Sequence, residues 1–165
     1  MRISVTVLLF CLCGSRCLSQ EQREEIPNHG MSFELLGTGG LGSIFYEHFF
    51  AQKEKRFMTF RMGLGFAPKY LSILDGVNVG LPHGVTINFG RKRNFEASIL
   101  GNLLFTPDDT QNTAYYMGPA LGYRKQTPKS FSRIFLGYYY LTGPEAGFFP
   151  NLGLALGFPF RKNDR

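Results

Sequence analysis

The sequence predicts an all-β protein, an eight-stranded antiparallel up-and-down transmembrane β-barrel. The closing stretch, NLGLALGFPF, alternates bulky apolar residues with small or polar ones. Because successive side chains of a strand point to opposite faces, this stretch has one face suited to lipid and one suited to a narrow lumen. The chain also contains 20 Gly, 17 Phe and 8 Tyr, which suits a tightly curved sheet with aromatic girdles. No interior stretch approaches the roughly 18 continuous apolar residues of a membrane helix.

Residues 1–19 predict an export signal peptide. Arg2 gives a positive start, residues 3–13 form an apolar core, and Cys17-Leu18-Ser19 is a cleavage region that leaves Gln20 first. All three cysteines lie in this segment, so we expect no disulfide, thiol chemistry or cysteine-bound metal in the mature chain. Lipidation at one of these cysteines is the alternative.

The remaining chain divides into a short leader and a barrel domain. Residues 20–31 are polar, contain Pro27 and Gly30, and predict a flexible periplasmic leader, so the outer-membrane barrel is expected over 32–165. Eight alternating runs follow, with boundaries good to about two to four residues. They cover residues 32–38, 43–50, 57–67, 82–90, 95–105, 113–125, 131–141 and 150–160.

The connections between these runs alternate in character. Those at 51–56, 91–94 and 126–130 are short and basic. An even number of antiparallel strands puts both termini on one side, and bacterial outer-membrane barrels keep termini and short turns in the periplasm. The sequence therefore predicts a basic periplasmic side, although charged turns could also simply be solvated. The other connections are mostly longer and richer in Pro, Gly and acids, and they cover 39–42, 68–81, 106–112 and 142–149.

The same alternation assigns the two faces of the wall. One face carries three acids and three bases, which we expect to form a salt-bridged cluster in the lumen near the periplasmic end, because unpaired buried charges are costly. This lumen set is Glu34, Glu47, Arg61, Glu96, Arg124 and Arg133. The residues expected to face lipid are Met58, Phe60, Met62, Leu64, Leu152, Leu154, Leu156, Phe158 and Phe160.

A soluble ligand-binding β-barrel is the alternative interpretation of the same eight strands. It would bury its bulky apolar residues and show polar ones to water, whereas here the Gly residues fall on the small, polar face, which could not line an apolar pocket well. The membrane reading is therefore preferred. Pro119 and Pro159 lie within predicted strands and predict a bulge or a strand end, because proline lacks the backbone donor.

Three runs of sequence resemble a known family. FELLGTGGLGSIFYEHFF (33–50) holds a Ser-x-x-Tyr-Glu strand, MGPALGYRKQ (117–126) a Gly-Tyr-Arg strand, and NLGLALGFPF closes the chain. Together they resemble the small outer-membrane β-barrel family of Gram-negative bacteria. The resemblance spans nearly the whole mature chain. It implies a fold and an outer-membrane location, and it implies no catalytic residues.

No motif predicts catalysis, a cofactor or a metal. His29 falls in the leader, His48 is expected to point outward, and His83 borders an outer loop, so their separation in strand order disfavours a metal site. A lipid-modifying hydrolase would use a Ser–His pair on the lipid-facing wall, but Ser43 lies a strand-length from His48. The glycine-rich segment 37–42 lacks the Lys-Ser/Thr ending of a phosphate loop and predicts a tight hairpin.

These observations predict an integral outer-membrane protein with a structural or surface-interaction role. An eight-stranded barrel is filled by its side chains, so no open pore is expected. A lipid-modifying enzyme and a soluble periplasmic ligand-binding barrel are the alternatives. The expected partners are outer-membrane lipids, the barrel-assembly machinery and a protein bound at loops 68–81 and 142–149. Nucleic acid is not expected, because an exported chain does not meet it, despite 18 Lys and Arg against 12 Asp and Glu.

Overall fold

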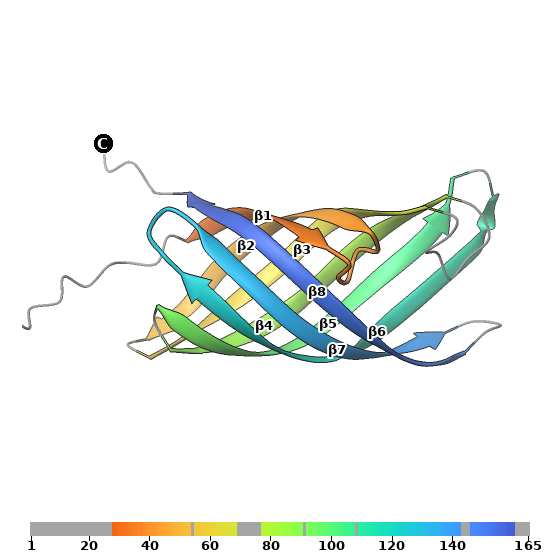
Figure 1. Cartoon of the computed structure of the whole chain (residues 1–165). Coiled ribbons are helices and arrows are strands. Elements are labelled where there is room, and N and C mark those ends of the chain that lie inside the picture. Colours follow the sequence, from red (N-terminus) through yellow and green to blue (C-terminus); the bar gives the residue numbers. More distant parts are fainter. Residues whose placement is uncertain are drawn as a thin grey trace, which may run out of the picture.

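The described chain forms a closed ring of eight antiparallel strands (Figure 1). The structure, a computed structural model, describes residues 28–53, 55–68, 77–90, 92–107, 109–142 and 146–160. Each strand pairs with its neighbours in sequence, and β8 pairs with β1 to close the barrel. This confirms the predicted all-β, up-and-down, eight-stranded fold. The strands are β1 (His29–Leu35), β2 (Gly42–Lys53), β3 (Arg56–Ala67), β4 (Asn78–Gly90), β5 (Arg93–Thr106), β6 (Asp109–Gln126), β7 (Phe131–Thr142) and β8 (Gly147–Phe160).

The observed strands differ from the predicted runs mainly at their ends. β1 begins at His29, so residues 29–31 belong to the sheet and not to the leader. β4 begins at Asn78 and β8 at Gly147, so part of each expected loop, 68–81 and 142–149, is strand. These strands begin earlier than the alternating runs because their first residues pair with a neighbouring strand. Such pairing between distant residues is not visible in the local alternation of apolar and polar residues. The expected signal peptide, residues 1–19, and residues 20–27 lie outside the described residues.

The barrel has two distinct ends. His29 pairs with Phe160, so both ends of the described chain share one end of the barrel with the β2–β3, β4–β5 and β6–β7 turns. We call this the terminal end. The β1–β2, β3–β4, β5–β6 and β7–β8 connections share the opposite end, which we call the loop end.

Strict alternation of side chains gives the wall an inner and an outer face. Along β7, Phe131, Arg133 and Phe135 are buried, while Ile134 and Leu136, which alternate with them, are exposed. Pro119, in the middle of β6, does not produce the bulge expected there. The β6–β7 register is the same on both sides of it, from Met117 paired with Tyr140 to Ala120 paired with Gly137. Pro159 pairs with Gly30 next to the end of β8, as a strand-end proline would.

The β1–β2 turn folds inward (Figure 1). Figure 1 shows this hairpin ending well short of the loop end. Thr38, in the turn, is fully buried, and the Nδ2 of Asn151 on β8 donates to the carbonyl oxygen of Gly37 at 3.1 Å. Gly65 on β3 permits the approach, because a Cβ there would lie 2.3 Å from the carbonyl oxygen of Gly39. The turn therefore fills part of the lumen.

The described interior is layered along the barrel axis. Nearest the terminal end is an aromatic layer of Phe49, Phe57 and Phe131. The charged side chains of the expected lumen set come next. The layer toward the loop end is mostly apolar and consists of Leu100, Leu104, Ala114, Tyr116, Ala120, Phe135, Tyr139 and Leu141, with Phe149 packed against it.

Candidate functional site

The interior charges form a paired network. All six residues of the expected lumen set are buried. The Nη1 of Arg124 lies 2.9 Å from the Oε2 of Glu47, and the Nε of Arg133 lies 2.8 Å from the Oε2 of Glu96. Arg61 pairs with Glu34, and Arg124 also lies 3.8 Å from Glu96. Because three acids meet three bases, the charges of this network balance.

Three of these ion pairs join strands that are not neighbours in the sheet, whereas Arg124 and Glu96 lie on the adjacent strands β6 and β5. Glu34 on β1 reaches Arg61 on β3, and Glu96 on β5 reaches Arg133 on β7. The pair of Glu47 and Arg124 joins β2 to β6, which lie opposite each other in the ring. The network therefore links walls that backbone hydrogen bonds do not connect.

Neutral groups complete several of these contacts. The Ser32 hydroxyl donates to the Oε1 of Glu47 at 2.8 Å, and the Nε of Arg124 donates to the Oε1 of Gln126 at 2.9 Å. The backbone amide of Thr38 donates to Glu34 at 2.6 Å, which ties the inward turn to the network. Burying charge is favourable only when such hydrogen bonds accompany the pairing.

Each arginine also lies over a phenylalanine ring. The guanidinium carbon of Arg61 is 3.6 Å from the ring centroid of Phe45, and that of Arg124 is 3.7 Å from Phe131. Arg133 covers Phe135 at 4.2 Å. Cation–π contacts of this kind gain strength where water is excluded. These aromatic partners were not predicted from the sequence, although the inward alternation of Phe45 and Phe135 was a signal for them.

The outer face is continuously apolar. All nine residues expected on this face point outward; Met58 is half-buried and the others are exposed, with Leu156 at 64% and Phe158 at 65%. Aromatic side chains lie toward both ends of the wall, with aliphatic residues such as Leu154 between them. The exposed aromatics near the terminal end include Phe89, Phe95, Tyr123, Phe158 and Phe160, and those near the loop end include Phe66, Tyr138, Tyr140 and Phe148.

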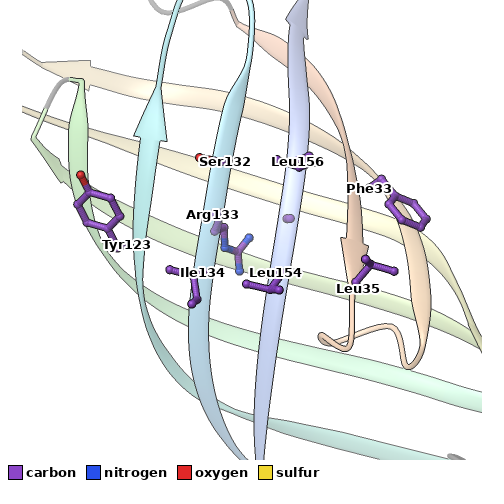
Figure 2. Close-up of a pocket in the computed structure, with 9 residues that line it drawn as sticks. Phe33, Leu35, Tyr123, Ser132, Arg133, Ile134, Leu154 and Leu156 are labelled. Carbon is purple, nitrogen blue, oxygen red and sulfur yellow. The ribbon is translucent and has the colours of Figure 1, made fainter.

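A hollow of about 370 Å³ runs along β8 on this outer face (Figure 2). Figure 2 shows Leu154 and Leu156 between side chains of β1 on one side and of β7 on the other. The small Ser132 side chain leaves room beside them. The lining also includes Phe33, Leu35, Tyr123, Arg133, Ile134 and Ala155.

The histidines are placed differently from the expectation. His29 lies in β1 and pairs directly with His48, so these two are not far apart in strand order. His83 lies within β4, not beside a loop, and its Nε2 is 3.2 Å from the hydroxyl oxygen of Tyr115 on the outer surface. Its Nδ1 lies 2.9 Å from the carbonyl oxygen of Leu81, so both ring nitrogens have partners.

Comparison with known proteins assigns no family. No family model matches the chain, and neither the curated proteins nor the solved structures include a match. Among the described residues, no helix is long and apolar enough to cross a bilayer, and no three His, Cys, Asp or Glu residues lie close enough together to hold one metal ion.

Proposed function

We propose that this chain is an integral outer-membrane β-barrel of the small Gram-negative family that its sequence resembles, with a structural or surface-interaction role. The observation that carries the proposal is the inverted distribution of side chains. Six charged residues are buried inside, while the exposed face is covered with Leu, Ile, Met, Phe and Tyr. In water-soluble proteins charged residues are seldom fully buried unless they are paired, and large contiguous apolar surfaces mark an interface with something other than water.

The aromatic residues near both ends of the wall support a bilayer as the apolar surroundings. Outer-membrane barrels carry an apolar band about 25 Å tall between two aromatic girdles. The hollow along β8 fits this proposal as a place for an acyl chain, because Phe33, Leu35 and Leu154 line it. A soluble ligand-binding barrel would hold its apolar surface on the inner face instead.

The terminal end carries exposed basic side chains just beyond the aromatic residues. Such groups favour the anionic headgroups of a bilayer surface. We therefore assign the terminal end to the periplasmic side, and the loop end to the cell exterior, where loops 68–81 and 142–149 would meet a partner. The exposed, described basic residues at the terminal end are Lys53, Lys55, Arg56, Lys92, Arg93, Lys125 and Lys129.

The proposed role is structural because the described side chains fill the lumen. The aromatic, charged and apolar layers follow one another along the barrel axis. The inward turn at Thr38 packs against the apolar layer toward the loop end. The protein would stabilise the envelope or present its outer loops, and it would depend on the barrel-assembly machinery for insertion. We propose no enzyme activity and no open pore.

The first prediction tests the membrane face. Leu154→Arg places a charge near the middle of the outer wall, where it should cost roughly 2–4 kcal/mol in a bilayer. Expressed in a Gram-negative host, the parent chain should appear in the outer-membrane fraction and change its gel mobility on boiling, and Leu154→Arg should reduce that species strongly.

Gln52→Arg, at an exposed position of the β2–β3 hairpin, is the matched control and should assemble like the parent. A parent chain found as a soluble periplasmic protein without a mobility shift would overturn the proposal and favour the soluble ligand-binding alternative. Normal assembly of Leu154→Arg would show that Leu154 does not face lipid.

A further inference from the structure

Three polar side chains meet on the outer surface at the terminal end. His29 on β1 pairs directly with His48 on β2, and Tyr46 lies two residues before His48 on the same face. The Nδ1 atoms of the two histidines are 3.2 Å apart, and the Tyr46 hydroxyl oxygen lies 2.5 Å from the Nδ1 of His29. Two strands thus bring three potential metal ligands to one point.

The hydrogen-bonding capacity of His29 does not match its two partners. The Nδ1 of a neutral imidazole carries either one proton or one lone pair. Both the Nδ1 of His48 and the hydroxyl oxygen of Tyr46 converge on that single atom. One proton can serve only one of these contacts well, whereas a cation placed between the three atoms would satisfy all of them.

The spacing also fits ligands of one ion. Zn–N bonds of 2.0–2.1 Å in a tetrahedral site place two ligand nitrogens about 3.3–3.4 Å apart. The observed separation of the His29 and His48 nitrogens, 3.2 Å, is close to this distance. The Tyr46 hydroxyl oxygen, 2.5 Å from the Nδ1 of His29, would have to move outward to serve as the third ligand. Imidazole nitrogen suits zinc, copper and nickel, whereas magnesium and calcium prefer oxygen ligands.

The surroundings hold the two rings in place and leave the site accessible. The His48 ring stacks on Phe50 with centroids 6.0 Å apart, and the His29 ring stacks on Tyr46 at 5.7 Å. The side chains of His29 and His48 are half-buried at the end of the barrel, so water can complete the coordination shell.

The geometry points to a binding site for a divalent transition metal formed by His29, His48 and Tyr46. Both imidazoles bind through Nδ1, and the Tyr46 oxygen supplies a third ligand. Each neutral imidazole then carries its proton on Nε2, which leaves both Nδ1 lone pairs for the metal. This site does not depend on the membrane proposal, because its geometry requires only the β1–β2 pairing.

The test is a titration of the refolded chain in detergent with Zn²⁺ and, separately, Cu²⁺. Cys11, Cys13 and Cys17 are replaced by Ser in every sample, because thiolates bind these ions themselves. His29→Ala and His48→Ala should each weaken binding at least tenfold, roughly the loss seen when even an outer-sphere partner is removed. The copper complex should show electron paramagnetic resonance coupling to two nitrogens, reduced to one in either variant.

His83→Ala is the matched control, because it removes an outward histidine that also contacts a tyrosine, Tyr115. It should bind like the parent. Equal affinity in His29→Ala, His48→Ala and the parent would overturn the site, as would an equal loss in His83→Ala. A far-ultraviolet circular dichroism spectrum that matches the parent's establishes that each variant has folded, so that a loss of binding is not a loss of structure.

Discussion

The two halves of the barrel interior are filled in opposite ways. Toward the terminal end, pairs such as Glu47 and Arg124 cross the lumen, and each arginine covers a phenylalanine ring. Toward the loop end, Leu104, Tyr116 and Phe149 pack as an ordinary apolar core. The charged half depends on particular partners, so removing one member leaves its partner buried without compensation. The apolar half loses only contact area when one member is truncated.

The largest loss of stability is expected from Glu47→Ala, in the charged half. The change leaves Arg124 buried without its closest carboxylate, which should cost about 3–5 kcal/mol of unfolding free energy. Denaturant unfolding of the detergent-refolded barrel, followed by loss of the fast-migrating gel band, measures this cost.

A double variant, Glu47→Leu with Arg124→Met, shows whether the cost comes from the orphaned charge. Apolar replacement of a whole buried pair is often neutral or stabilising, so the double variant should recover most of the lost stability. If Glu47→Ala unfolds like the parent, the charged half does not hold the barrel together.

A smaller effect is expected from truncation in the apolar half. Leu104 is 3% exposed and belongs to the apolar layer toward the loop end. Leu104→Ala should therefore cost about 2–4 kcal/mol of unfolding free energy, through lost contacts and the cavity left behind. The same unfolding measurement applies. The exposed Leu103, one residue earlier, is the control, and Leu103→Ala should change stability in detergent much less.

The smallest effect tests the link between the apolar half and the inward turn. The Tyr116 hydroxyl donates to the carbonyl oxygen of Thr38 and accepts from the Nδ2 of Asn102 at 3.0 Å. Tyr116→Phe removes both bonds and should cost about 1–2 kcal/mol. Faster amide exchange in residues 36–41 would show that the turn loosens, and unchanged exchange there would count against this link.

The strands and the inner face were predictable from sequence because alternation is a local property. Glu34, Glu47 and Arg61 could be assigned to the inner face because every second residue of a strand points to the same side. Their pairing could not be predicted in this way. Glu47 and Arg61 are direct partners in the β2–β3 register, yet Arg61 pairs with Glu34 and Glu47 with Arg124. Which side chains meet across the lumen depends on how the ring closes.

The histidine cluster and the burial of the inward turn were not predicted, because both depend on contacts between segments that are distant in the sequence. His29 precedes the first clear alternation, so it was assigned to the leader, and only its pairing with His48 shows that it belongs to the sheet. The segment 37–42 was expected to form a tight hairpin, and its chain reversal is confirmed. Its burial against Gly65 and Asn151 depends on contacts with β3 and β8 that no local pattern encodes.

The short first strand has a consequence for how the ring is assembled. β1 contributes seven residues, and it meets β8 over His29–Leu35 and Leu154–Phe160, residues separated by most of the chain. Every other pair of neighbouring strands is joined by a connection within one hairpin. Loop-closure entropy makes such a distant pairing the slowest to form. We therefore expect the hairpins to form first and the β1–β8 seam, which pairs over seven residues of each strand, to close last.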